Sequence, residues 1–108
     1  MKYLLLLATL AAPSLATADG FVIGAGRWNC GDVVAADAPD KSAERLQIAG
    51  WIFGYWSAAT FARETAFIDT VENVGGNAIL DATLAECQKA APETPLFRIV
   101  QQMITNTN

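Results

Sequence analysis

The longest uncharged stretch of the chain is LQIAGWIFGYWSAATFA, 17 residues that lie between Arg45 and Arg63. Strong helix-forming residues continue to about Arg63. The negative charge of Glu44 suits the positive N-terminal end of a helix. Asp40 or Ser42 is a suitable N-cap. The pattern therefore predicts one long helix that begins near residue 40 and ends near residue 63.

Apolar residues occur on every side of this predicted helix, which is typical of either the buried centre of a fold or a membrane span. Gln47, Ser57 and Thr60 weaken its insertion into a bilayer. A span would also place Cys30 and Cys87 on opposite sides of the membrane. We therefore expect a buried central helix and no membrane span in the mature form.

The flanking segments predict a short helix before the long one and a linker after it. Asn29, with Asp32 three residues later, resembles a capping pair, so a helix is expected from Cys30 to about Ala36. Residues 64–74 show no clear hydrophobic period and are expected to form a linker that Gly75-Gly76 ends.

Two more helices are predicted near the C-terminus. One begins at Gly76 or Asn77 and stops by Ala91, and the other has Thr94 as N-cap and Pro95 as its first helical residue. Each carries an apolar stripe at helical spacing. The stripes are Ile79, Ala82, Thr83 and Cys87 in the first helix, and Leu96, Ile99, Val100 and Met103 in the second.

Residues 1–18 have the pattern of a signal peptide. Lys2 precedes a ten-residue apolar stretch, and Ala16-Thr17-Ala18 place small residues where a signal peptidase cleaves. The pattern predicts export to the periplasm and a mature protein of residues 19–108, which form a single helical domain.

The two cysteines, Cys30 and Cys87, would enter an oxidising compartment together. An even cysteine count in a short exported chain indicates a disulfide. We therefore predict an all-α fold, a small four-helix bundle-like domain in which one disulfide joins the first helix to the third.

Composition excludes several classes of function. The chain has no histidine, the commonest general base and metal ligand, and oxidised cysteines provide no thiolate. Without Lys2, six Lys and Arg stand against eleven Asp and Glu, a side-chain charge of −5, and the basic residues form no cluster. We expect no enzyme, no catalytic residues, no metal, no cofactor and no nucleic-acid partner.

Aromatic residues crowd the long predicted helix, and a small domain rarely covers every side of such a helix. Core packing explains most of these rings, but some are expected to face a second molecule, because aromatic residues dominate the centres of interfaces. The residues predicted for a client or homodimer interface are Trp51, Phe53, Tyr55 and Trp56. Gly50, Gly54 and Ala58 are predicted to allow close helix packing.

The segment Trp28-Asn29-Cys30-Gly31-Asp32 resembles the Trp-x-Cys-x-Asp start of the HdeA/HdeB-like acid-stress chaperones of the bacterial periplasm. The stretch from Val74 to Ile79, followed by Cys87, is similar to the one that leads to their second cysteine. The resemblance implies a protein that loosens in acid and binds unfolding clients. This chain lacks the lysine-rich C-terminal end of those chaperones.

The Gly50–Tyr55 run also resembles the Rap1a/Tai-type immunity proteins, which are disulfide-containing helical inhibitors of secreted cell-wall hydrolases. This second resemblance implies a folded module that binds and blocks an enzyme. Both functions require a protein partner, either unfolding clients or one specific target.

Overall fold

The computed structural model describes residues 20–107, and the predicted signal peptide at residues 1–18 lies outside this range. Five α-helices follow a 3-10 turn, η2 (Ala25–Arg27). They are α2 (Cys30–Ala35), α3 (Ser42–Thr60), α4 (Thr65–Val74), α5 (Gly76–Lys89) and α6 (Leu96–Thr105). Residues 20–107 contain no strand, only an isolated bridge between Asn29 and Pro95. The predicted all-α, bundle-like fold is confirmed.

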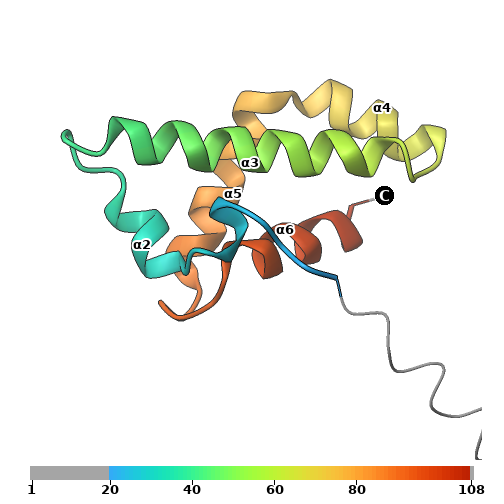
Figure 1. Cartoon of the computed structure of the whole chain (residues 1–108). Coiled ribbons are helices and arrows are strands. Elements are labelled where there is room, and N and C mark those ends of the chain that lie inside the picture. The colour runs from blue at the N-terminus through green and yellow to red at the C-terminus, as the bar shows by residue number, and fades with distance from the viewer. Residues whose placement is uncertain (1–19, 108) are drawn as a thin grey trace, which may run out of the picture.

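Helix α5 is the element around which the others are arranged. It contacts α2, α3, α4 and α6. In Figure 1, α3 and α4 lie side by side, and α5 leads from them to the opposite layer, which holds α2 and α6. The long helix α3 was expected to be a buried central helix. It contacts η2, α4, α5 and α6, but it is buried on one side only, through Ile48, Ile52 and Trp56.

The disulfide joins Cys30, the first residue of α2, to Cys87 in the last turn of α5. Both side chains are buried, and their Cα atoms are 5.0 Å apart. The predicted link between these two helices is therefore confirmed. The predicted cap of α2 is also present, because the Asn29 side chain accepts a hydrogen bond from the Asp32 backbone N–H at 2.9 Å.

The linker predicted at residues 64–74 is wrong, because Thr65–Val74 form helix α4 with Glu64 as its N-cap. The helix has an apolar stripe, Phe67, Val71 and Val74, that is too short to stand out in the sequence. Phe67 is fully buried. Gly75 ends α4 with φ of 83°, a left-handed conformation that glycine adopts without strain, and α5 begins at the next residue.

Helices α5 and α6 lie close to their predicted ranges, with differences at single positions. Ile79, Thr83 and Cys87 are buried as expected, but Ala82 is exposed. Pro95 takes the N-cap position predicted for Thr94, because its backbone is extended. Lys41, rather than Asp40 or Ser42, stands at the N-cap of α3 and provides no side-chain hydrogen bond. The stripe of α6 is placed as predicted, with Leu96, Ile99 and Val100 buried and Met103 half-buried.

Candidate functional site

The buried side of α3 contains one of the four rings predicted for an interface. Trp56 is only 5% exposed, and its ring lies nearly parallel to that of Phe67, with centroids 6.1 Å apart. A side chain in this position offers a partner little surface while the protein stays folded. In the folded protein Trp56 therefore belongs to the core, and its predicted role in binding unfolding clients stays a prediction.

Trp51 covers the segment that precedes α2, and Tyr55 lies beside Trp51. The Trp51 indole Nε1 donates a hydrogen bond to the Ile23 carbonyl oxygen at 2.9 Å. The Tyr55 ring is tilted against the Trp51 ring, with centroids 5.0 Å apart. Both residues are half-buried. Their main contacts are thus within the chain, and a role in an interface stays a prediction.

Phe53 lies on the side of α3 that faces the start of α5. A Cβ built on Gly76 would stand 3.4 Å from the Phe53 ring, which is ordinary van der Waals contact. Phe53 is half-buried, so part of its ring remains available to a partner.

The side of α3 that faces away from the core is uncharged and exposed. We call it the outer face, and it consists of Leu46, Gln47, Gly50, Gly54, Ser57 and Ala58, with Phe61 at the C-cap. Phe61 is 92% exposed and Leu46 is 75% exposed. A Cβ built on Gly50 or Gly54 would meet no atom of residues 20–107 within 4 Å. Among residues 20–107, Gly50 and Gly54 therefore do not pack against another helix as predicted, and Ala58 is exposed on the same side.

The helical period explains why these residues share one face. Successive α-helical residues are rotated by about 100°. Gly50 and Gly54 therefore each lie about 160° around the helix axis from the buried Ile52. They stand one on each side of the point directly opposite Ile52. Leu46 and Phe61, which no prediction placed in the site, extend the same face toward the two ends of α3. Because apolar residues lie all round α3, its sequence did not indicate which side would be exposed.

A hollow of about 500 Å³ adjoins the C-terminal end of the outer face, between α3, α4 and α5. Phe53, Trp56, Phe61, Val71 and Ile79 supply most of its apolar lining. The buried Nε1 of Trp56 finds no hydrogen-bond acceptor among the described residues. Phe61 thus stands beside a hollow large enough for an apolar side chain of a partner.

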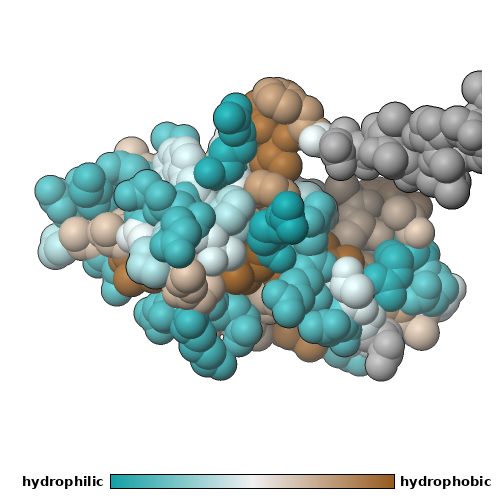
Figure 2. All heavy atoms as spheres, turned by 90° about the horizontal axis from the view of Figure 1, so that it is seen from below, coloured by the Kyte–Doolittle hydropathy of each residue, from teal (hydrophilic) through white to brown (hydrophobic). Residues whose placement is uncertain are grey.

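The view from below (Figure 2) shows a largely hydrophilic surface with a brown patch beside the grey segment. The described chain begins in this region, and its Phe21 and Ile23 are 78% and 75% exposed. The Phe21 ring lies under the Arg27 guanidinium at 5.5 Å. This second exposed apolar segment is short and has a charged neighbour, unlike the outer face of α3.

Arg63 connects the end of α3 to the end of α6, a role that its isolated position in the sequence did not indicate. Its guanidinium donates hydrogen bonds to the carbonyl oxygens of Ile104 and Thr107 and lies 4.2 Å from the Phe67 ring centroid. It also pairs with Glu64 at 3.1 Å. The Arg63 hydrogen bond is the main reason why the pKa of Glu64 lies below its ordinary value of 4.5.

The ion pairs of residues 20–107 are local. Each joins side chains one or three positions apart, and all are at least partly exposed: Lys41–Glu44, Arg63–Glu64 and Lys89–Glu86. No ion pair in this range joins two helices. Exposed pairs of this kind contribute little to stability.

Comparison with protein-family models, with curated proteins and with solved structures gave no significant match for this chain. No helix within residues 20–107 is both long enough and apolar enough to cross a membrane. Within the same range, no three His, Cys, Asp or Glu side chains are grouped closely enough to hold a metal ion.

Proposed function

We propose that this chain is an exported, non-enzymatic binding protein whose outer face of α3 docks onto a folded target protein, as an inhibitor or immunity protein does. One observation carries the proposal. The face is uncharged from Leu46 to Phe61, and the large apolar side chains at its two ends are 75% and 92% exposed.

The chemistry of the outer face suits the centre of a protein interface. Interface centres are depleted in charge, and buried aromatic anchors supply much of the binding energy. Phe61 is a suitable anchor. Gly50 and Gly54 lack side chains, so the backbone of a partner can approach α3 closely between Leu46 and Phe61.

The same face favours a target bound at neutral pH. Its residues are exposed in the folded protein, so no loosening is needed before a partner can reach them. The three ion pairs within residues 20–107 are local, and none of them joins two helices. Protonating their carboxylates in acid therefore breaks no ion pair between helices.

Site-specific crosslinking tests the proposal. A photoreactive phenylalanine analogue at position 61 should crosslink to one exported protein in the producing cell at neutral pH. The same analogue at Gln101, which is exposed on α6, is the matched control and should give no such product. Leu46→Glu should abolish the crosslink from position 61, because it places a charge on the same face.

The activity of the crosslinked protein decides the mode of action. If it is a hydrolase, adding the purified chain should inhibit it at an equimolar ratio, and Leu46→Glu should relieve the inhibition. A crosslink only between two copies of the chain would contradict target binding and support the homodimer that the sequence predicts. Equal crosslinking from positions 61 and 101 would contradict a specific face.

An acid-activated chaperone is the second candidate, and the position of the disulfide favours it. The bond fixes α2 to α5, whereas α3 and α4 contain no cysteine and carry no disulfide. Near pH 2–3 the carboxylates are largely protonated, so the mature chain becomes strongly positive and repels itself. Helices α3 and α4 would then separate while the disulfide limits expansion.

Aggregation assays distinguish the two candidates. A chaperone should suppress the aggregation of an unrelated acid-denatured protein near pH 2–3 and lose its near-UV circular dichroism in the same range. A target-binding protein should keep its tertiary signal at neutral pH, bind there, and suppress no aggregation in acid.

A further inference from the structure

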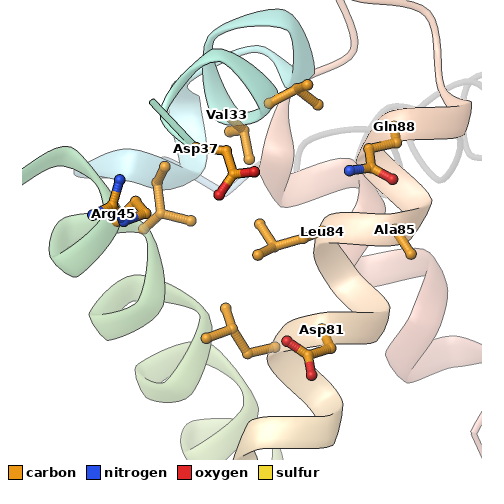
Figure 3. Close-up of a pocket in the computed structure, with 10 residues that line it drawn as sticks. Val33, Asp37, Arg45, Asp81, Leu84, Ala85 and Gln88 are labelled. Atoms are coloured by element: carbon orange, nitrogen blue, oxygen red, sulfur yellow. The ribbon is translucent and has the colours of Figure 1, made fainter. Parts of the chain in front are cut away.

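A second hollow, separate from the outer face of α3, lies between α2, α3 and α5. Its volume is about 310 Å³, the space of about ten water molecules at about 30 Å³ each. Figure 3 shows side chains from the three helices converging on it. This size suits a small molecule with about ten non-hydrogen atoms, at the lower end of the usual range for ligand sites.

The floor of the hollow is apolar. Val33 comes from α2, Ile48 from α3, and Leu80 and Leu84 from α5. Val33 and Ile48 are buried, whereas Leu80 and Leu84 are half-buried and retain surface that a ligand can cover. Covering apolar surface is favourable by roughly 25 cal/mol per Å². The floor therefore favours a hydrocarbon or aromatic group.

Two carboxylates stand at the edge of this floor. Asp37 follows α2 and Asp81 belongs to α5, and in Figure 3 they lie on different sides of Leu84. Neither carboxylate forms an ion pair or a side-chain hydrogen bond with any described residue. An ionised carboxylate is an acceptor only. Both groups are therefore free to receive N–H donors from a ligand.

The hollow has one basic group, which is already engaged. Arg45 Nη1 donates to the carbonyl oxygens of Ala36 at 3.2 Å and Ala38 at 2.6 Å, and so ties α3 to the turn after α2. The Gln88 amide is neutral. Two free carboxylates and one guanidinium make the lining acidic, in a chain with a net charge of −4. An anionic ligand is thus disfavoured and a cationic one favoured.

We propose that this hollow binds a small organic ammonium ion, in which an apolar group of up to about ten non-hydrogen atoms carries one positive charge. The apolar part covers Leu80 and Leu84, and the ammonium group donates to Asp37 or Asp81. Such a ligand combines the two properties of the lining, whereas a neutral hydrocarbon uses only the floor. The site is independent of the outer face and of the function proposed for it.

Titration with hexylammonium, followed by amide NMR of the whole protein, tests the proposal. The shifts should concentrate at Val33, Leu80, Leu84 and Ala85 and leave Gly50 and Gly54 unchanged. Hexanol, with the same chain and no charge, should bind at least twofold more weakly, and hexanoate should not bind measurably. Raising the salt concentration should weaken hexylammonium, because salt screens exposed charges.

Charge and volume variants separate the two parts of the site. Asp37→Asn and Asp81→Asn should each weaken hexylammonium binding about two- to fivefold, the usual effect of losing an exposed ion pair. Asp69→Asn, the same charge change on α4, should have no effect. Ala85→Leu, which fills the hollow from its wall, should abolish binding while the remaining amide spectrum shows a folded protein.

Several outcomes would overturn the assignment. Hexanol and hexylammonium binding equally well would remove the role of the carboxylates. Equal losses for Asp69→Asn and Asp37→Asn would show only general charge attraction. A blocked peptide containing one lysine that binds more tightly than hexylammonium would make the hollow a protein-docking site instead.

Discussion

The indole ring of Trp51 lies directly against Gly26, so that a Cβ at position 26 would overlap the ring. The Trp51 Nε1–H is also bonded to the Ile23 carbonyl oxygen. The absence of a side chain at Gly26 therefore allows η2 to pack closely against α3. Its backbone φ is not positive, so the requirement for glycine here is steric.

Gly26→Ala should lower the free energy of unfolding by about 1–3 kcal/mol, the usual effect of overpacking a well-filled site. Urea unfolding followed by tryptophan fluorescence measures the change, and the near-UV circular dichroism should report an altered Trp51 environment. Wild-type stability in this variant would show that Trp51 does not pack on Gly26.

Gly54→Ala is the matched control, and it should raise the free energy of unfolding by about 0.5–1 kcal/mol. Alanine restricts the unfolded chain more than glycine, and no atom of residues 20–107 lies within 4 Å of the new Cβ. A destabilised Gly54→Ala variant would indicate that another element, or a second copy of the chain, packs on the outer face.

Phe67 and Phe61 should respond oppositely to truncation. Phe67→Ala removes a fully buried ring stacked on Trp56, which should cost about 3–5 kcal/mol in the free energy of unfolding. Phe61→Ala should change it by less than about 0.5 kcal/mol, because the ring is 92% exposed. Thermal unfolding measures both, and a large loss for Phe61→Ala would contradict its exposed position.

The carboxyl group of Glu64 should titrate below pH 4.5. The Arg63 hydrogen bond lowers the pKa of Glu64 in the folded state, so the stability from this contact is present above 4.5 and lost as pH falls through the lower folded value. NMR detection of the Glu64 carboxyl carbon measures the midpoint. Arg63→Met should return it toward 4.5, and a midpoint at or above 4.5 in the wild type would contradict the contact.

Replacing both Cys30 and Cys87 by alanine should cost about 4 kcal/mol in the free energy of unfolding, as the chain-entropy model predicts for a loop closed by residues 57 positions apart. Chemical denaturation measures the loss. Thiol labelling of denatured, unreduced protein is the direct check on the bond. Two reactive thiols per chain would contradict the disulfide.

Local signals in the sequence were sufficient for much of the fold. The Asn29 cap, the Gly75-Gly76 pair and the stripe from Leu96 to Val100 each depend on residues within a few positions of one another, and the structure has a helix at each place. The cysteine count was sufficient to predict the disulfide, because only one intramolecular pairing exists for two cysteines.

The tertiary structure alone decided which side of α3 is exposed and whether residues 64–74 fold. Helix α3 has apolar residues on every side, so only the contacts of Ile48, Ile52 and Trp56 with the rest of the fold select its buried face. Helix α4 is stabilised by the packing of Phe67 on Trp56, two residues that local pattern did not connect. The sequence by itself thus determined most helices and the disulfide, while the exposed Leu46 and Phe61 of the candidate site depend on packing between distant segments.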